Sequence, residues 1–336
     1  MSVLSWNCRG VGLPWNVRFL KDVVRQEKPA FVFLCETIGR HDRVEWVRRQ
    51  LGYEGMIVVE PQGRSGGLCL LWKEMDQGKL LSYSQNHIDI EVRIEGMEVW
   101  RLTGIYGEPV RANRRKTWDL LRHLARDSNL PWVGIGDMNN ICSHADKKGG
   151  NAYPNWLIDG FNETLMDVGL IDMSLTGHQF TWERGRGTSE WIEVRLDRTL
   201  TTDAWLTVFP AVRLYNLEGS ESDHSPLLLI PKRYDRSQNC THFRFENAWL
   251  SEPMCLEVVK DSWEENSKSD IQEKVKLCGE KLLVWGKEIT GDFAKRIREC
   301  KVELKQWRGR RDTQAVQNYK ETKKKLFLIL DQREIF

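Results

Sequence analysis

Ser222-Asp223-His224-Ser225-Pro226-Leu227 runs directly into the apolar residues 228–230, and this stretch sets the pattern for the rest of the chain. A polar triplet at the start of a short apolar strand places a carboxylate and an imidazole at the rim of a sheet. Acids or amides also end apolar runs upstream, at Asn7, Glu36, 137–139 and Asp197. We therefore predict that these polar side chains gather at one rim of the fold.

Apolar runs and helical spacing alternate along the first two-thirds of the chain. Apolar runs predict strands at residues 2–8, 30–35, 56–59, 68–72, 88–94, 99–106, 132–136, 180–182, 192–198 and 227–230. Helical spacing predicts helices at residues 16–26, 41–51, 113–126, 156–168 and 202–208. Both halves mix directly connected strands with strands joined through helices. This mixture predicts an α/β fold in which two mixed β-sheets pack face to face with helices outside them.

The character of the chain changes after Pro231. We predict a first domain at residues 1–232, a polar linker at 233–248 and a helical extension of two or three helices at 249–336. Residues 260–336 are basic overall, whereas residues 1–259 are slightly acidic. A basic tail suits a nucleic-acid partner, but a solvated helical face has the same composition and is the more common explanation. The end at Phe336, without a polar tail, suggests that the chain is cut from a longer polypeptide.

Composition narrows the class of protein. The 336 residues are 40% hydrophobic and 29% charged, which predicts a packed core, and the net charge of +2 neither favours nor excludes nucleic acid. The eight cysteines include no CxxC pair, which argues for a reducing compartment and against a disulfide framework or a zinc site. No apolar run approaches the ~20 residues of a membrane span. We expect a nuclear or cytoplasmic protein that is not secreted and has no membrane partner.

Three strand ends carry signals that are weak on their own. Asn7 can ligate a hard cation or orient a phosphate, although such an Asn is more often a turn former. Glu36 ends an apolar run, where an unpaired charge is rare, and it is our first choice for a magnesium-binding carboxylate. An acid near the start of a helix explains Glu36 equally well. Tyr106 can donate to a phosphate oxygen, but an aromatic residue half packed into the core is the more common case.

Gly134-Ile135-Gly136-Asp137-Met138-Asn139 is a stronger signal. Small residues let neighbouring backbones approach closely, and the strand end then presents Asp137 and Asn139 on the same side. An aspartate in this position can take a proton from water, and Asn139 can hold the phosphate or the water. The alternative is an Asx turn after a strand, which the Asp-x-Asn pair makes less attractive.

Asp197 lies in one predicted strand, while Asp223 and His224 precede the last one. An aspartate that faces a histidine fixes the tautomer and the orientation of the imidazole. A buried carboxylate partner also raises the histidine pKa, which favours the charged form that can stabilise a phosphate during hydrolysis. Among the seven histidines, His224 is the one in such a setting.

In order and spacing, these residues resemble the endonuclease/exonuclease/phosphatase superfamily. The resemblance rests on Trp6-Asn7, Glu36, Tyr106, Gly136-Asp137-Met138-Asn139, Leu196-Asp197-Arg198 and Ser222-Asp223-His224. It is closest to the apurinic-type endonuclease domain of plant non-LTR (LINE-type) retrotransposons, through residues 5–10, 180–182, 195–198 and 243–249. The resemblance implies a four-layered, DNase I-like α/β sandwich with its site at one end of the sheets. The helical extension is similar to the connector that precedes a reverse transcriptase in such elements.

This resemblance also implies an activity, a metal and a partner. It implies a magnesium-dependent endonuclease (with Mn²⁺ as an alternative ion) that nicks DNA and leaves a 3′-hydroxyl. The implied metal ligands are Asn7, Glu36 and Asp223.

The resemblance assigns further roles to single residues. Asp137 would position or deprotonate the attacking water beside Asn139, and Tyr106 would contact the phosphate. Asp197 would orient His224, which would stabilise the transition state. The candidate DNA contacts are Arg9, Arg198 and Ser222.

Arg9 departs from the apurinic-type pattern, which usually has an acid two positions after the motif Asn. Arg9 could instead reach a DNA phosphate. This departure argues against abasic-site repair more than against nicking.

Two other functions compete with DNA nicking. One is a phosphatase or phosphodiesterase of the same superfamily, against which the sequence offers only the lack of an evident basic cluster near the site. The other is a catalytically silent remnant of a retrotransposon that binds nucleic acid, against which the retention of the motif residues argues.

Overall fold

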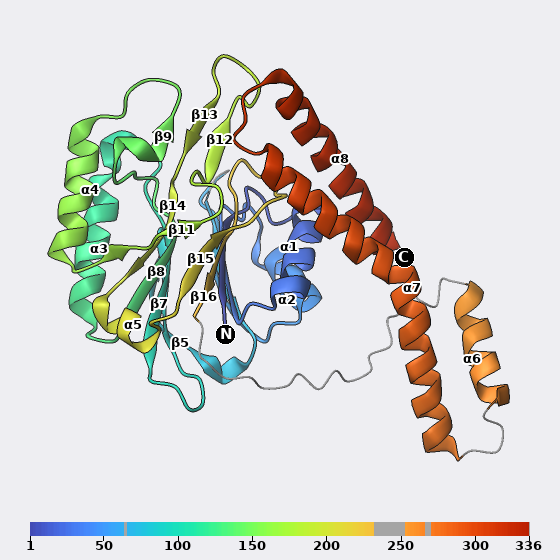
Figure 1. Ribbon diagram of the computed structural model, residues 1–336. Helices are drawn as coiled ribbons and strands as arrows, with labels where there is room; N and C mark the ends of the chain where they lie inside the picture. The colour runs from blue at the N-terminus through green and yellow to red at the C-terminus, as the bar shows by residue number, and fades with distance from the viewer. Residues whose placement is uncertain (64–65, 232–252, 266–269, 336) are drawn as a thin grey trace. The chain divides into compact units, whose positions relative to one another are not determined.

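The structure is a computed structural model that describes residues 1–63, 66–231, 253–265 and 270–335. The chain divides into two compact units (Figure 1). The first contains Met1–Arg233 together with the short segment Gly309–Val316, and the second contains Tyr234–Arg308 and Gln317–Phe336. The linker expected at 233–248 lies outside the described residues, so the domain boundary at residue 232 stays a prediction.

Two mixed β-sheets form the centre of the first unit. The seven-stranded sheet has the order β11 (Leu175–Thr176), β15 (Arg213–Asn216), β16 (Leu227–Ile230), β1 (Val3–Asn7), β2 (Phe31–Cys35), β4 (Leu68–Trp72) and β3 (Gly55–Val59). The six-stranded sheet has the order β10 (Ile171–Asp172), β14 (Asp197–Thr201), β8 (Trp132–Asp137), β7 (Trp100–Tyr106), β6 (His87–Val92) and β5 (Gly78–Ser84). A small third sheet joins β12 (Trp182–Arg184), β13 (Ile192–Val194) and β9 (Lys147–Lys148).

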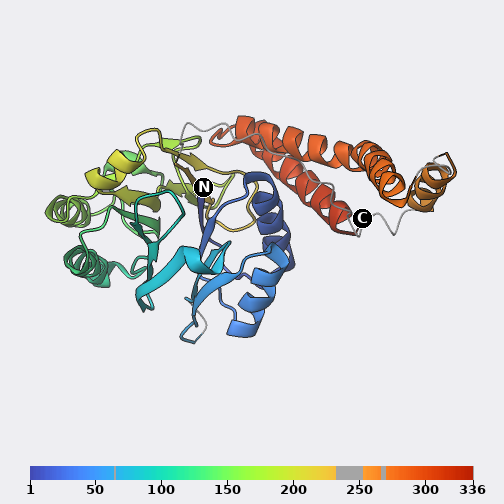
Figure 2. The ribbon, with the colours of Figure 1, turned by 90° about the horizontal axis from the view of Figure 1, so that it is seen from below.

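Helices cover the outer faces of both large sheets (Figures 1 and 2). Helices α1 (Pro14–Glu27) and α2 (His41–Leu51) pack on the seven-stranded sheet, and α3 (Arg115–Asp127) and α4 (Asn155–Asp167) pack on the six-stranded sheet. The short helix α5 (Asp203–Val208) adds Trp205 to the core between the sheets. The prediction of a four-layered α/β sandwich is confirmed.

Strand β2 shows why its apolar run is continuous. Phe31, Phe33 and Cys35 point into the core between the two sheets, whereas Val32 and Leu34 point into the core beneath α1 and α2. Successive side chains of a strand face opposite sides, so a central strand covered on both faces needs apolar residues at every position. Polar side chains follow where such a strand ends. Glu36 comes directly after β2, and Asn7 is the last residue of the neighbouring strand β1.

The structure corrects the prediction of one strand at residues 192–198. The segment forms two strands, β13 and β14, that belong to different sheets. Strand β13 pairs with β12 and β9, whereas β14 pairs with β8 and β10, so the chain changes sheets at Arg195 and Leu196. The strand predicted at residues 180–182 is instead β12 at Trp182–Arg184, which pairs with β13.

Several strands were not predicted at all. Strand β5 is largely exposed and ends its sheet, so it lacks the apolar run that marks the central strands. Strand β15 has four residues, and Leu214 is its one buried hydrophobic residue, so it also lacks an apolar run.

The second unit contains three described helices, α6 (Pro253–Glu265), α7 (Ile271–Trp307) and α8 (Thr313–Ile335), although the first residues of α8 cluster with the first unit. Ile297, Cys300 and Leu304 of α7 pack with Leu326 and Ile329 of α8. The helical extension of the predicted fold is therefore present. Among the described helices, none is long and apolar enough to cross a membrane.

Candidate active site

Strand register in the seven-stranded sheet brings three predicted residues to one rim. Asn7 ends β1 beside Cys35 at the end of the parallel strand β2, and Glu36 follows Cys35 directly. Strand β16 runs antiparallel to β1, so the segment before it, which carries His224, lies at the same rim. The side chain of Trp6 fixes this segment by donating from Nε1 to the backbone oxygen of His224 at 3.2 Å.

The six-stranded sheet supplies the other half of the site. Asp137 ends β8, where it pairs with Tyr106 at the end of the parallel strand β7 and with Asp197 at the start of the antiparallel strand β14. Gly136 immediately before it has a φ of 149°, a conformation that side chains disfavour, and a Cβ there would lie 2.0 Å from the Ile105 carbonyl oxygen. Glycine at this position therefore lets β8 approach β7 closely just before Asp137.

Asn7 joins the two halves of the site. Its Nδ2 donates to Glu36 Oε1 at 2.9 Å and to Asp137 Oδ2 at 3.0 Å. Asn7 is fully buried, and each carboxylate belongs to a different sheet. A single amide thus holds the two carboxylates at a set separation across the sandwich.

His224 is held between two carboxylates. Its Nδ1 lies 2.8 Å from Asp197 Oδ2, and its Nε2 lies 3.8 Å from Asp137 Oδ2. Burial by itself lowers the pKa of His224, but Asp197 and then Asp137 outweigh that effect and raise the pKa to about 9. The imidazole is therefore charged near neutral pH, with both ring nitrogens acting as donors.

Asp137 is buried at the centre of this arrangement. Burial raises the pKa of Asp137 to about 6, against the opposing effect of the charged His224. Its Oδ1 accepts a hydrogen bond from the backbone nitrogen of Asn139 at 2.9 Å. The Asn139 side chain donates from Nδ2 to the Gly107 carbonyl oxygen at 2.9 Å, which fixes it beside the carboxylate.

Glu36 has one engaged oxygen and one that faces the pocket. Oε1 accepts from Asn7 and, at 3.0 Å, from the Tyr106 hydroxyl. Tyr106 was expected to contact a phosphate; here its hydroxyl orients Glu36. Oε2 faces Arg9, whose Nε lies 3.6 Å from it and 2.9 Å from Asp223 Oδ1.

The residues present fit a hard divalent cation. Asn7 Oδ1 is buried, and no hydrogen-bond partner for it exists in the described part of the chain. An unpaired buried amide oxygen is costly, and beside a carboxylate it forms the oxygen donor set that Mg²⁺ prefers. Asp137, Asp197 and His224 also lie close enough to share an ion. Because the His224 imidazole is charged and bonded to Asp197, it is a poor ligand, and Asn7 with Glu36 fits the ion better.

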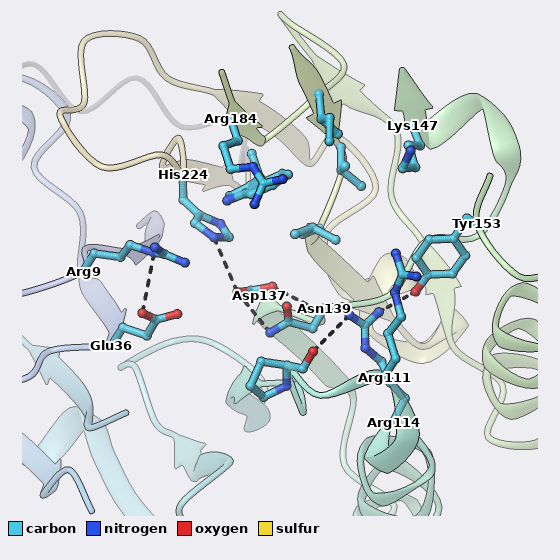
Figure 3. Close-up of a pocket in the computed structure, with 15 residues that line it drawn as sticks. Arg9, Glu36, Arg111, Arg114, Asp137, Asn139, Lys147, Tyr153, Arg184 and His224 are labelled. Atoms are coloured by element: carbon cyan, nitrogen blue, oxygen red, sulfur yellow. Dashed lines mark hydrogen bonds and ion pairs between the residues drawn. The ribbon is translucent and has the colours of Figure 1, made fainter. Parts of the chain in front are cut away.

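Glu36, Asp137, Asn139 and His224 line a pocket of about 320 Å³ (Figure 3). Its lining residues are Arg9, Glu36, Pro109, Arg111, Arg114, Asp137, Asn139, Lys147, Tyr153, Trp182, Arg184, Ile192, Val194, Leu196 and His224. In Figure 3, Glu36, Arg9 and His224 lie on one side, Asp137 lies in the middle, and Arg111, Arg114 and Lys147 lie around Tyr153 on the other side, while Arg184 is drawn above His224.

Four other cations line this pocket and were missed in the sequence: Arg111, Arg114, Lys147 and Arg184, together called the basic side of the pocket. Within the described ranges, no carboxylate pairs with any of these four cations. Arg114 is 6% exposed and donates to the Tyr153 hydroxyl, and Arg111 lies 5.4 Å from the centre of the Tyr153 ring. Burial and the nearby Arg111 lower the pKa of Lys147. The sequence signal was a scatter of basic residues in three separate segments, which is typical of any solvated surface.

Two of the predicted DNA contacts lie elsewhere. Arg198 is fully buried, where it pairs with Asp146 and Asp172 and supports the loop that follows β8, so it has no surface to offer DNA. The Ser222 hydroxyl donates to the Asn7 carbonyl oxygen at 2.8 Å and joins the loop before β16 to β1. Arg9 is the one of the three that lines the pocket.

Comparison with known proteins gives one family and several structures of the same fold. The sequence model of the endonuclease/exonuclease/phosphatase family matches residues 4–224. A search of curated protein sequences found no match.

The similar structures include the endonuclease domain of TRAS1, a telomere-specific non-LTR retrotransposon, at 18% identity and a TM-score of 0.52, with 70% of this chain and 99% of that one covered. An AP endonuclease from Archaeoglobus fulgidus is similar at 14% identity and a TM-score of 0.54, with 69% and 100% covered. A 3′ phosphatase from Neisseria bound to a product DNA hairpin is similar at 18% identity and a TM-score of 0.53, with 69% and 100% covered. At these identities the structures establish the fold.

Proposed function

The chain belongs to the endonuclease/exonuclease/phosphatase family, and we propose that it is a magnesium-dependent DNA endonuclease derived from a non-LTR retrotransposon. The observation that carries this proposal is the position of His224, 2.8 Å from Asp197 and 3.8 Å from Asp137, in one pocket with Glu36. Such a site suits hydrolysis of a phosphodiester, because it combines a buried carboxylate with a fixed cationic donor.

Asn7 and Glu36, with Asp223 beside them, would hold the Mg²⁺, and Mn²⁺ would fit the same oxygens. The ion would supply Lewis-acid chemistry, withdrawing charge from a phosphate oxygen. Tyr106 would keep Glu36 oriented toward it through the hydrogen bond from its hydroxyl.

Asp137 would take a proton from the attacking water. Its raised pKa makes it a stronger base than an ordinary aspartate, and Asn7 and Asn139 hold both of its oxygens in place. His224 would donate from Nε2 to the phosphate as its negative charge grows, while Asp197 keeps the ring charged and oriented. The water oxygen would bond to phosphorus as the bond to the 3′ oxygen breaks, and the 3′ oxygen would take a proton from solvent, leaving a 5′-phosphate and a 3′-hydroxyl.

The basic side of the pocket supports a polyanionic substrate. Four cations without carboxylate partners in the described structure line the same pocket as Asp137 and His224, and they suit the phosphates of a nucleic-acid strand. The similar structures include one bound to a DNA hairpin and the endonuclease domain of a non-LTR retrotransposon, and both support a DNA substrate.

A plasmid-nicking assay tests this proposal. We expect the full chain to convert supercoiled DNA to the open circle with Mg²⁺, and to lose this activity with EDTA or in His224→Ala. His123→Ala is the matched control, because the His123 side chain is 74% exposed and lies on α3. Extension of the nick by a polymerase without prior end repair would establish the 3′-hydroxyl. DNA binding without nicking under all metals would contradict the proposal and favour the silent remnant.

Phosphatase activity is the second candidate, and the basic side of the pocket favours it. The sequence argument against a phosphatase was the lack of such a cluster, and the structure contains one. Release of inorganic phosphate from small phosphate monoesters, without plasmid nicking, would select this function.

A further inference from the structure

Arg9 places a positive charge at the carboxylates assigned to the metal. Its Nε lies 2.9 Å from Asp223 Oδ1 and 3.6 Å from Glu36 Oε2 (Figure 3 shows the contact with Glu36). No other described cation forms an ion pair with either carboxylate.

The remaining oxygens of these two carboxylates are already engaged. Glu36 Oε1 accepts from Asn7 and Tyr106, and Asp223 Oδ2 accepts from Trp182 Nε1 at 2.8 Å. The guanidinium therefore faces the two oxygens that are left for a divalent cation. A cation entering between Glu36 and Asp223 meets the Arg9 charge directly.

We propose that Arg9 is the internal counter-ion of the metal site: it competes with the divalent cation for Glu36 and Asp223, and the cation releases it to the DNA backbone. This inference rests on the metal ligands of the proposed function. Arg9 thereby lowers the metal affinity of the site and couples metal binding to DNA binding. Since a guanidinium stays charged at every accessible pH, only another cation or a phosphate can relieve the competition.

The loop that carries Arg9 is built for movement of the side chain alone. The Gly10 nitrogen donates to the Glu36 carbonyl oxygen at 2.8 Å, and Asn16 Nδ2 donates to the carbonyl oxygens of Cys8 and Gly10 at 2.6 and 2.8 Å. The backbone on both sides of Arg9 is thus anchored. Its side chain is 49% exposed at the mouth of the pocket, so it can turn outward without rearranging the loop.

Arg9→Met removes the charge and keeps the length of the side chain. We expect it to bind Mn²⁺ about two- to fivefold more tightly than the wild type, the range that corresponds to a partly exposed ion pair. Arg9→Lys keeps the charge, so its Mn²⁺ affinity should be close to that of the wild type. Arg184→Met is the matched control, because Arg184 lines the same pocket without pairing to Glu36 or Asp223 in the described structure.

Isothermal titration of the DNA-free full chain with MnCl₂ measures these affinities, with circular dichroism to verify folding. Unchanged or weaker Mn²⁺ binding in Arg9→Met would overturn the inference and make Arg9 a support for the carboxylates. Glu36→Gln tests the assignment of the site separately. If it binds Mn²⁺ as the wild type does, the metal ligands themselves are wrong and the inference falls with them. If competition holds but plasmid is not nicked, the proposed function fails while the inference stands.

DNA binding provides the second readout. In the His224→Ala background, which we expect to be silent in nicking, fluorescence anisotropy gives DNA affinity with and without Mn²⁺. We expect Mn²⁺ to raise the affinity for DNA more in His224→Ala than in the double variant with Arg9→Met, because coupling between two ligands is reciprocal. An equal gain in both proteins would show that Arg9 does not couple the two ligands.

Discussion

The charge on His224 is the property of a single residue on which the proposed chemistry depends. Burial opposes that charge, and without partners the imidazole would be neutral near pH 7. Asp197 at 2.8 Å is the first of the groups that reverse this, followed by Asp137 at 3.8 Å. In the proposed chemistry, Asp197 orients the His224 ring and favours its charged form, and Asp137 accepts a proton from the attacking water.

Asp197→Asn tests this balance. We expect the pKa of His224 to fall from about 9, because the largest carboxylate contribution is removed and only Asp137 and Asp223 then oppose the effect of burial. An NMR titration of the histidine ring protons in the metal-free protein measures it, with the other six histidines as internal controls. A His224 pKa that stays near 9 in the variant would assign the charge to Asp137 instead.

The same shift links stability to pH. The folded pKa of His224 lies above its unfolded value, so the charged ring stabilises the fold fully below pH 6.5, and this contribution is lost as the pH rises through about 9. We expect the free energy of unfolding of the wild type to fall more across this window than that of Asp197→Asn.

At the scale of the elements, the end of β8 determines where the chemistry sits. Strand β8 is the neighbour of both β7 and β14, and its last residue is Asp137. Gly136 keeps β8 close to β7, since any Cβ there would collide with backbone rather than with a movable side chain. Of the two glycines in β8, Gly136 is therefore the one that the close approach of β8 to β7 requires, whereas Gly134 faces a movable side chain.

Gly136→Ala and Gly134→Ala form a matched pair. A Cβ at Gly136 meets the Ile105 carbonyl oxygen at 2.0 Å, whereas one at Gly134 meets the tip of the Ile105 side chain at 3.0 Å. We expect Gly136→Ala to lose roughly 2–4 kcal/mol of unfolding free energy and most nicking activity, because β8 must move with Asp137. Gly134→Ala should cost clearly less. Urea unfolding measures both, and equal losses would show that the close approach at Gly136 is unimportant.

At the scale of the whole molecule, the two units have separate cores. All three large apolar clusters of the first unit fall within residues 1–230, and the helices of the second unit have clusters of their own. One short segment complicates the boundary, since Gly309–Val316 groups with the first unit. Its Arg311 lies 3.0 Å from the buried Glu193 of β13 and 4.7 Å from the centre of the Trp191 ring.

The predicted domain 1–232 should therefore fold alone and keep metal-dependent nicking. It loses the Arg311 ion pair, but His178 remains 3.1 Å from Glu193. We expect a melting temperature a few degrees below that of the full chain, and Arg311→Gln in the full chain should reproduce most of this decrease. An insoluble or inactive fragment would contradict the predicted boundary.

The sequence by itself determined the layers and the candidate catalytic residues. Apolar runs that end in acids and amides are local signals, because a strand buried on both faces is mostly apolar along its length and most readily accommodates polar groups at its ends. Asn7, Glu36, Asp137 and His224 followed from that pattern, and the structure brings them together.

Only the tertiary structure decided how charges pair. That Arg9 faces Glu36 and Asp223, that Arg198 is buried, and that Arg111 and Lys147 share a pocket depends on loops far apart in the chain. A basic residue in a loop has the same local pattern whether it faces solvent, a carboxylate or a substrate. Sheet register, which the whole core sets, determines which of these three surroundings a basic residue has. The partners of a charged residue therefore depend on the fold and not on the residues beside it in the sequence.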